Sequence, residues 1–498
     1  MSTKRSGQIP TGILVLGGAA AAAVAFLTVH FSGAQAGYDS SWHLVWANQV
    51  LEGTKPTFDA WAAPTEHPLL LGIGLVAALF GPAAENAAFL TLTLCALLAL
   101  LPALKRLSLN IFETWLPGAL AWVLMAGAYG LLLQALRGYL DVWFLLLVTV
   151  AAILAVERKQ AAAAWLPLAL AGLLRPEAWL LAGLLLVFSW RSAPRTARIQ
   201  LLAATVLPAL VWFGIDAAVT GNPFLSFTTA RNLAVEGGGG AVHAAGSALL
   251  GGIRGPATLL GLIGAGLVWR QREKRDLLVP AGLVAVGIGM ALLITIAGLT
   301  LLPRYLLLCD LGLALFAGYA LGGWAAFPAK DSTIWRTAGV AAMVLGAAGA
   351  IVLGAPTKLA NEVRLDSSVH RDLSALLKQP DVILSIEHCR QGVLPIQETV
   401  TFPSFRLIPD ALLILHENHA TRDTAVRGRA QLPGTDSSLA VTIIPTDTDK
   451  RILDRYSHPG IKLPIDERVP KGFTQTGASG PFMAWNSCRR AQALHQTP

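Results

Sequence analysis

Long apolar runs separated by short polar segments fill the first 355 positions of the chain. The first run, TGILVLGGAAAAAVAFLTVHF, matches the length of about 20 residues that a helix needs to cross a bilayer. Such runs predict membrane-spanning helices, because the strands of a β-barrel would alternate apolar and polar positions. We expect about eleven spans, at residues 11–32, 85–104, 115–135, 139–156, 162–174, 176–190, 200–220, 248–269, 278–301, 305–326 and 337–355.

Basic residues fall between these runs and give the spans an orientation. If the N-terminus is cytoplasmic and the spans alternate, every basic cluster lies on the cytoplasmic side, as the positive-inside rule expects. The net charge of +8 then reflects membrane topology and indicates no nucleic-acid partner. The clusters are Lys4/Arg5, Lys105/Arg106, Arg158/Lys159, Arg191/Arg195/Arg198, Arg270/Arg272/Lys274/Arg275 and Lys330/Arg336.

One apolar segment is not counted as a span. HPLLLGIGLVAALFG, residues 67–81, is short, and counting it would place Lys105 and Arg106 outside the cell. We predict an interfacial or re-entrant helix here, inside a long first external loop of residues 33–84.

The same loop contains WHLVWANQVL, residues 42–51. Trp42 and Trp46 lie one helical turn apart, which predicts an amphipathic helix at the membrane surface. Both tryptophans, and Trp61 after them, are assigned to the aromatic belt of the membrane interface.

The segments 162–174 and 176–190 are too short to cross the bilayer separately at full thickness. They predict a hairpin with its tip, Leu174-Arg175-Pro176-Glu177, recessed below the outer surface. Charged residues at that depth must face protein or a wet cavity.

The C-terminal part differs in kind from the membrane part. In the whole chain 54% of the residues are apolar and 14% are charged, but charged residues are frequent in 356–498. The runs DVILSIEH, DALLILHE and LAVTIIPT are typical of strands. We therefore expect a transmembrane module at 1–355 and an extracytoplasmic soluble domain at 356–498, with an α/β or mostly β fold.

Cysteine usage fits this division. Cys95 and Cys309 lie inside apolar runs and are typical of small buried apolar side chains. Cys389 and Cys488 lie in the C-terminal part, where an extracytoplasmic location would allow one disulfide between them.

Titratable residues gather on the predicted external side of the membrane. Carboxylates beside arginines in a partly buried cavity suit acid–base chemistry on an anionic substrate. The paired donors of an arginine also suit a lipid phosphate. The residues concerned are Asp39, His43, Asp59, Glu66, His67, Arg137, Asp141, Arg175, Glu177, Arg231 and Arg304.

Structural alternatives exist in the first external loop. Asp39 is placed to cap a helix that begins near Ser40. Glu66 and His67 are placed to begin the re-entrant helix, with the acid near its N-terminus. His43 and His67 lack the short spacing that is typical of metal ligands.

The later charged residues also have structural alternatives. Arg137 and Asp141 have the spacing of a salt bridge on one helix. Arg175 and Glu177 are placed to stabilise the tip of the hairpin, and Arg304 to anchor a helix at the membrane interface.

Six short motifs stand in a specific order along the chain. They are Tyr38-Asp39-Ser40 followed by a helix ending in LEG, the segment PTEHPLLLGIGLVAALFG, the cytoplasmic turn LKRLSLN, Arg137-Gly-Tyr-Leu-Asp141, Leu174-Arg175-Pro176-Glu177 and Arg304-Tyr305. In this order, and on these sides of the membrane, they resemble the GT-C membrane glycosyltransferases over residues 11 to about 326. That group includes protein O-mannosyltransferases, lipid A aminoarabinose transferases and their actinobacterial relatives.

The resemblance implies a GT-C-like membrane module in a bacterial plasma membrane. It implies transfer of a hexosyl or pentosyl group, such as mannose or arabinose, from a polyprenyl-phosphate sugar to a glycan, lipid or protein acceptor on the extracytoplasmic face. Asp39 would be the general base of an inverting reaction. The remaining substrate-binding residues would be His43, Glu66, His67, Arg137, Asp141, Arg175, Glu177 and Arg304.

The chain departs from the family at one point. The family commonly has two adjacent acids after its first span, whereas this chain has Asp39-Ser40. The second carboxylate is missing, or Glu66 or Asp59 supplies it. No cofactor follows from this pattern, and a divalent cation stays open.

A transporter or flippase for a lipid-linked or anionic solute is the alternative class, since charged residues in a wet cavity would serve it too. Transporters usually show internal repeats and broken helices at the membrane midplane. No repeat is visible here, and the acids gather at one face, which favours the enzyme.

Overall fold

The computed structural model describes residues 33–56, 58, 65–158, 161–236, 256–299, 301–383, 400–402, 408–417, 429–430, 441–445 and 474–486. The first predicted span, 11–32, lies outside the described residues, and so do Asp59 and Trp61. Cys389 and Cys488 also lie outside them, so the predicted disulfide stays a prediction.

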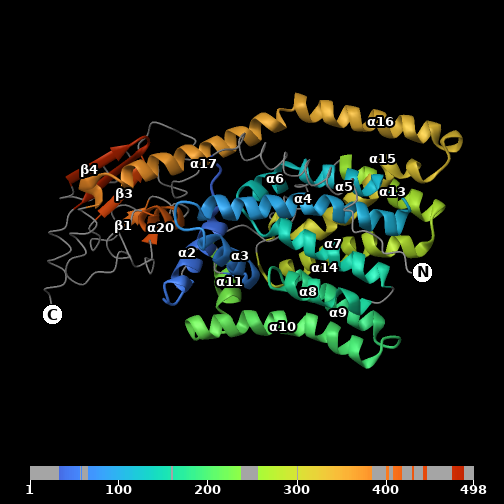
Figure 1. Ribbon diagram of the computed structural model, residues 1–498, viewed down its shortest axis with the longest axis horizontal. Helices are drawn as coiled ribbons and strands as arrows, with labels where there is room; N and C mark the ends of the chain where they lie inside the picture. Colours follow the sequence, from blue (N-terminus) through green and yellow to red (C-terminus); the bar gives the residue numbers. More distant parts are fainter. Residues whose placement is uncertain are drawn as a thin grey trace, which may run out of the picture.

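The helices run mostly along the long axis of the molecule, and the strands gather at one end, beyond α2 and α3 (Figure 1). The helices of the bundle and of the first loop are α2 (Tyr38–Leu51), α3 (Pro68–Ala78), α4 (Glu85–Phe112), α5 (Leu116–Ala126), α6 (Tyr129–Leu136), α7 (Asp141–Glu157), α8 (Trp165–Gly172), α9 (Glu177–Ser189), α10 (Arg195–Thr220), α11 (Leu225–Glu236), α13 (Pro256–Gln271), α14 (Leu278–Ile296), α15 (Leu307–Gly322) and α16 (Ala329–Val352). Short 3-10 turns are η1 (Ala161–Ala164), η2 (Lys274–Leu277), η3 (Pro303–Leu306) and η4 (Gly323–Ala326).

Among the described residues, five helices are long and apolar enough to cross a membrane. The expected total of about eleven spans therefore stays a prediction. The five are Glu85–Phe112, Arg195–Thr220, Leu278–Ile296, Pro303–Ala326 and Ser332–Val352.

The predicted span at 115–135 is broken. α5 and α6 are bent by 73° at a short break, and together they would make a sixth crossing. The break falls at Gly127 and Ala128, where Ala128 has extended backbone angles and glycine is a poor helix former.

The short apolar segments form the helices that the sequence predicted. α3 has only 11 residues, and α8 and α9 flank the tip at Arg175. None of the three meets the length of a complete span.

Two spans of similar composition occupy opposite environments. The window in Pro303–Ala326 is 94% buried, whereas the window in Ser332–Val352 is 6% buried. The span that contains α15 is central because glycines let its neighbours approach closely. A Cβ on Gly318 would lie 2.1 Å from the backbone oxygen of Pro117 on α5. α16 instead presents apolar side chains such as Leu345 outward, as a lipid-facing helix does.

The C-terminal part contains two helices and a mixed sheet among its described residues. The helices are α17 (Ala355–Leu377) and α20 (Ile408–Glu417), and the strands are β1 (Val400–Phe402), β2 (Arg429–Ala430), β3 (Val441–Pro445), β4 (Thr474–Ser479) and β5 (Phe482–Asn486). The strand order is β2-β1-β3-β5-β4. β1 runs parallel to β2 and β3, and β5 runs antiparallel to β3 and β4.

Of the three predicted strands, LAVTIIPT is confirmed as β3, but DALLILHE is wrong because it forms α20. Ala411, Leu412 and Leu415 are buried at helical spacing, so the segment buries the face of a helix. In DVILSIEH the first residues, 381–383, are also helical, and the rest lies outside the described residues.

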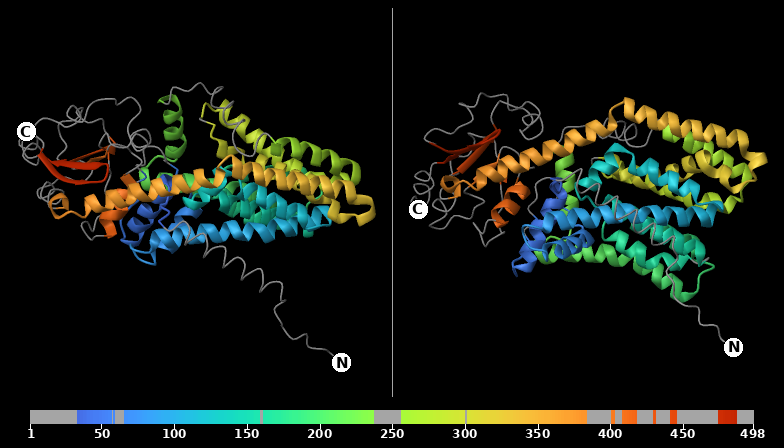
Figure 2. Two further views of the ribbon diagram at one scale, coloured as in Figure 1. Left: turned by 90° about the horizontal axis from the view of Figure 1, so that it is seen from above. Right: turned by 45° about the horizontal axis from the view of Figure 1, so that its top comes forward.

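The C-terminal elements pack directly on α2, at the same end of the bundle (Figures 1 and 2). Trp42 and Trp46 are 2% and 0% exposed and share a hydrophobic cluster with Leu373, Leu412 and Phe482. The prediction of a surface helix with tryptophans at the membrane interface is therefore wrong. α2 is buried from Asp39 to Gln49, because α3, α17 and α20 cover it.

Candidate functional site

Asp39 and Arg304 form an ion pair at the end of the bundle that faces the sheet. Asp39 lies in the first turn of α2, and its Oδ2 accepts a hydrogen bond of 2.8 Å from Nη1 of Arg304 in η3. The helix cap is Gly37, one residue before the helix starts, so the capping alternative for Asp39 is wrong. The pair joins the first external loop to the start of the most buried span.

Tyr139 lines the same pair and was missed by the sequence reasoning. The guanidinium of Arg304 lies over its ring, 5.6 Å from the centroid. Gly37 packs so closely that a Cβ there would be 2.2 Å from the ring. In the sequence, the only indication that Tyr139 belongs to the site is its place inside the Arg137-Gly-Tyr-Leu-Asp141 motif.

Arg175 at the tip of the hairpin lies at the centre of a second, fully buried cluster. Its guanidinium donates to Asp141 at the start of α7, to Glu177 at 3.1 Å and to the backbone oxygen of Arg304 at 3.2 Å. Asp141 therefore pairs with Arg175, and the alternative salt bridge with Arg137 is wrong. The contact with the Arg304 carbonyl connects this cluster to the Asp39 pair.

Several polar atoms in this cluster have no hydrogen-bond partner among the described residues. They are Oδ2 of Asp141, Oε2 of Glu177 and Nε of Arg175. Buried polar atoms are normally paired, so these three are exceptions that need a structural or functional reason. The position of the three side chains between α7, α9 and η3 fits an accessory role beside the Asp39 pair.

His67 also lies here, at the N-cap of α3 before Pro68, as the sequence predicted. Its Nδ1 is 2.8 Å from the backbone oxygen of Leu174, and its Nε2 is 3.0 Å from the Thr65 hydroxyl. Burial lowers its pKa well below the usual value, and the positive charges around it add to this effect. The neutral ring then donates from Nδ1 and accepts at Nε2.

His43 stacks on His67 with ring centroids 5.6 Å apart. Both of its ring nitrogens face backbone oxygens, Asp39 at 2.6 Å and Glu66 at 2.8 Å. Burial is the larger influence and lowers its pKa, so the neutral ring donates to one of the two carbonyl groups at a time. His43 thus ties α2 to the residue before His67.

Glu66 is fully buried and points away from Asp39, toward α10 and α11. Its Oε2 accepts a 2.9 Å hydrogen bond from the hydroxyl of Ser226, which also lies 3.1 Å from Oδ1 of Asp216. Burial, followed by the nearby charge of Asp216, raises the pKa of Glu66 to about 8. Asp216 and Ser226 were missed, although an aspartate inside an apolar run is itself a signal of function.

The guanidinium of Arg137 is engaged by α17. Nε donates to Oδ2 of Asp366 at 2.8 Å, and Nη2 lies 3.4 Å from Oε2 of Glu362. The structure thus brings Asp39, His43, His67, Asp141, Arg175, Glu177 and Arg304 together. It places Glu66 and Arg137 at the edges of this group.

No three His, Cys, Asp or Glu side chains come together as a metal site in the part of the chain that the structure describes. Each ring nitrogen of His43 and His67 faces a backbone oxygen or the Thr65 hydroxyl. A divalent cation stays untested.

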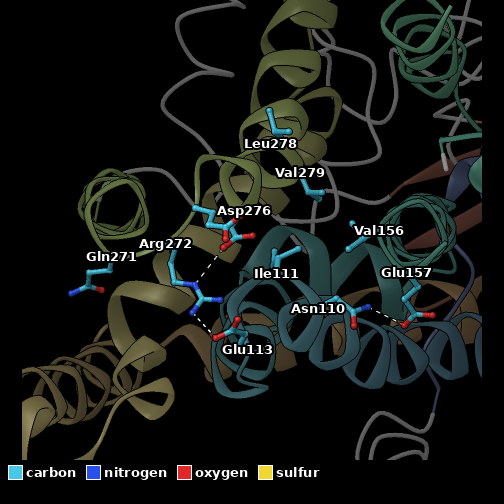
Figure 3. Close-up of a pocket in the computed structure, with 11 residues that line it drawn as sticks. Asn110, Ile111, Glu113, Val156, Glu157, Gln271, Arg272, Asp276, Leu278 and Val279 are labelled. Carbon is cyan, nitrogen blue, oxygen red and sulfur yellow. Dashed lines mark hydrogen bonds and ion pairs between the residues drawn. The ribbon is translucent and has the colours of Figure 1, made fainter. Parts of the chain in front are cut away.

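A second polar region lies at the other end of the bundle (Figure 3). A cavity of about 900 Å³ is lined by Asn110, Glu113, Glu157, Arg272 and Asp276, among others. Its polar side chains pair among themselves: Arg272 donates to Glu113 at 2.8 Å, and Asn110 donates to Glu157 at 2.9 Å.

The two regions lie at opposite ends of α4. Asn86, at its start, binds the backbone of Ala36 beside α2. Asn110, near its end, lies about 36 Å away at about 1.5 Å per residue. In the predicted topology the second region is cytoplasmic.

No protein-family model matches the sequence, and no curated protein matches it. The structure is similar to the crystal structure of ArnT from Cupriavidus metallidurans bound to undecaprenyl phosphate, with a TM-score of 0.52 and 14% identity. The match covers 96% of this chain and 98% of that chain. The chain shares the fold of that protein. The predicted resemblance is thereby confirmed for the fold, and the chain is a multi-pass membrane protein.

Proposed function

We propose that the chain is a GT-C membrane glycosyltransferase. It moves a sugar, hexosyl or pentosyl, from a polyprenyl-phosphate donor to an envelope glycan, lipid or protein on the extracytoplasmic face of a bacterial plasma membrane. The observation that carries the proposal is the partly buried ion pair of Asp39 with Arg304. It places a carboxylate and a guanidinium 2.8 Å apart, at the point where the first external loop meets the bundle. The shared fold with a protein crystallised with undecaprenyl phosphate supports the donor class.

Asp39 acts as the general base in this proposal. Arg304 holds Oδ2, so Oδ1 takes the proton of the acceptor hydroxyl as that hydroxyl attacks the anomeric carbon. The bond from that carbon to the phosphate oxygen breaks, and the configuration is inverted. The leaving polyprenyl phosphate departs as an anion.

Arg304 stabilises that anion as its charge grows. Its side chain is 22% exposed, whereas that of Arg175 is 4% exposed, so Arg304 is the more accessible of the two. Arg175 donates a hydrogen bond to the backbone carbonyl oxygen of Arg304 and so holds that backbone in place. A well-placed donor of this kind contributes about 10²–10³ to the rate. The neutral rings of His43 and His67 and the carboxylates of Asp141 and Glu177 complete the wall of the site.

The test uses purified protein in lipid nanodiscs. Radiolabelled polyprenyl-phosphate mannose, arabinofuranose and glucose are each incubated with the protein and a membrane extract that supplies acceptors. One donor should be consumed, and Asp39→Asn, which keeps the size of the side chain but removes its basicity, should abolish turnover. Glu157→Gln, an exposed carboxylate at the other end of the bundle, is the matched control.

Each outcome has a distinct meaning. Turnover that survives in Asp39→Asn would keep the enzyme class and move the base to another carboxylate, with Glu66 tested next. With the same protein in sealed liposomes, a donor that crosses the bilayer without being consumed would contradict the proposal and favour the transporter.

A further inference from the structure

One face of α17 lies against the corner of the bundle where α6 ends. The residues of this face follow one another at helical spacing, so they form a single stripe along the helix. They are Leu359, Glu362, Val363, Asp366 and Ser367. In both views of Figure 2 the helix continues from α16 past this corner toward the sheet.

The apolar members of the stripe fasten α17 to the bundle. Leu359 and Val363 are buried in a cluster with Leu94 of α4 and with Leu133 and Leu136 of α6. Burial of such apolar side chains stabilises the contact. This part of α17 is therefore a fixed element of the bundle.

The polar members of the stripe bind Arg137. Its guanidinium lies between two carboxylates, with Asp366 at 2.8 Å and Glu362 at 3.4 Å. The side chains of Arg137, Glu362 and Asp366 are 20%, 31% and 13% exposed. A phosphate that approached Arg137 would have to displace one or both carboxylates, so the site is poorly suited to the substrate anion that the sequence assigned to it.

The backbone of Arg137 in turn holds the start of α2. Its carbonyl oxygen accepts a 2.7 Å hydrogen bond from the N–H of Gly37, the N-cap of α2. A second connection runs from the hydroxyl of Ser367 to the backbone oxygen of Gly33. Asp39 follows Gly37 by two residues, so the orientation of its carboxylate depends on where this helix begins.

We propose that Arg137 is a positioning residue, through which Glu362 and Asp366 of α17 fix the start of α2 and thereby the direction of Asp39. The inference rests on the proposed function for its catalytic consequence. It replaces direct substrate binding by Arg137 with a mechanical role. It also makes the helix that leads into the C-terminal sheet a part of the catalytic apparatus, because a shift of about 1 Å in a catalytic group costs on the order of a hundredfold in rate.

The first test is a charge exchange. Arg137→Glu and Asp366→Arg should each lower kcat by about tenfold to a hundredfold while the KM for the lipid donor changes by less than about twofold. The double variant Arg137→Glu/Asp366→Arg restores an ion pair with reversed polarity, and Glu362 can then pair with the new arginine one turn away on the same helix. We expect it to recover at least half of the lost kcat. Arg371→Glu is the matched control, since this arginine is exposed on the same helix and pairs only loosely, at 3.6 Å, with Asp372.

The second test does not need turnover. Hydrogen–deuterium exchange of the peptide that contains Gly37 to Ser41 should become faster in Asp366→Arg and return toward the wild-type rate in the double variant. Arg137→Lys, which keeps the charge, should lie between. This measurement remains valid if no glycosyl transfer is found, so failure of the coupling and failure of the proposed function can be told apart.

Two results would overturn the inference. One is a KM for the donor that rises about tenfold or more in Arg137→Glu without rescue in the double variant, since that would make Arg137 a phosphate ligand. The other is an exchange rate at Gly37 to Ser41 that is unchanged in Asp366→Arg, since that would remove the mechanical link.

Discussion

Both ends of the bundle carry arginine–carboxylate pairs, but the two sets are built differently. At the Asp39 end, Arg175 and Asp141 are 4% and 0% exposed, and they connect α7, the α8–α9 tip and η3. At the other end, Arg106 and Glu157 are 65% and 25% exposed, although their two hydrogen bonds of 2.6 and 2.7 Å have better geometry. The two pairs differ in desolvation. Hydrogen-bond geometry alone would predict that the exposed pair is the stronger one.

Desolvation decides what such a pair can do. An exposed pair contributes little to stability and is screened by salt. A buried set costs free energy to form and persists only where several elements hold it. The buried set here includes unpaired polar atoms, whereas Glu157 at the other end accepts hydrogen bonds from both Arg106 and Asn110. The burial of the paired charges therefore distinguishes the candidate site from the cavity at the other end.

The largest effect that would sharpen this contrast is expected at Arg304. Arg304→Ala should lower kcat by about a hundredfold to a thousandfold, because it removes the donor nearest to the leaving phosphate. Arg304→Lys keeps the charge without the paired donors and should retain part of the rate. Steady-state assays with the donor found active in wild type measure both. A change in KM alone, with kcat intact, would assign Arg304 to ground-state binding.

The next effect concerns stability at Arg175. Arg175→Met should destabilise the protein by about 3–5 kcal/mol, since it leaves Asp141 and Glu177 buried without their partner. Arg175→Met/Asp141→Leu should be more stable than the single variant because one of the stranded charges is gone. The two variants are compared by thermal unfolding in detergent, measured as the loss of the monodisperse peak with rising temperature. Equal stability of the two would mean that the cluster is hydrated.

A smaller effect depends on pH at Glu66. Its folded pKa of about 8 lies above the usual 4.5, so between these values the folded protein binds more protons than the unfolded chain. Stability contributed by this group is complete below pH 4.5 and is lost as pH rises toward 8. Glu66→Gln stays neutral and should match wild type near the low end of this window. At pH 8 it should have a Tm higher by roughly 2–4 °C.

Asp216→Asn is the companion variant for this window. It removes the charge that helps to raise the pKa of Glu66, and should therefore also flatten the pH dependence of the Tm. If the Tm of Glu66→Gln falls as steeply with rising pH as that of wild type, a group other than Glu66 causes the pH dependence of the Tm.

The smallest effect is expected at the cavity at the other end of the bundle. Arg106→Ala breaks an ion pair that water already solvates, so activity should stay within about twofold of wild type and the Tm should be nearly unchanged. The same assays measure it at low and high salt. A loss as large as that of Arg304→Ala would remove the contrast between the two ends and give this cavity a function of its own.

Much of the fold could be predicted from local patterns along the chain. Apolar runs placed most of the described helices of the bundle within a few residues, and the short run at 67–81 was correctly kept apart as α3. Where the pattern was ambiguous, prediction failed. DALLILHE is a short apolar run that fits a strand or a helix, and packing against α2 and α17 selects the helix. WHLVWANQVL was predicted at the surface because no local signal announces that α17 and α20 cover it.

The candidate site, like the fold, could be predicted from the sequence only in part. The sequence by itself predicted which charged residues lie together at one end of the bundle, because hydropathy and the positive-inside rule act locally. Only the tertiary structure decided the partners. Asp39 meets Arg304 across 265 positions and Arg137 meets Asp366 across 229, whereas Asp141, close to Arg137 in the sequence, was the wrong partner for it. Burial gives these distant pairs their strength, and burial is a property of the packed bundle that no short stretch of the chain contains.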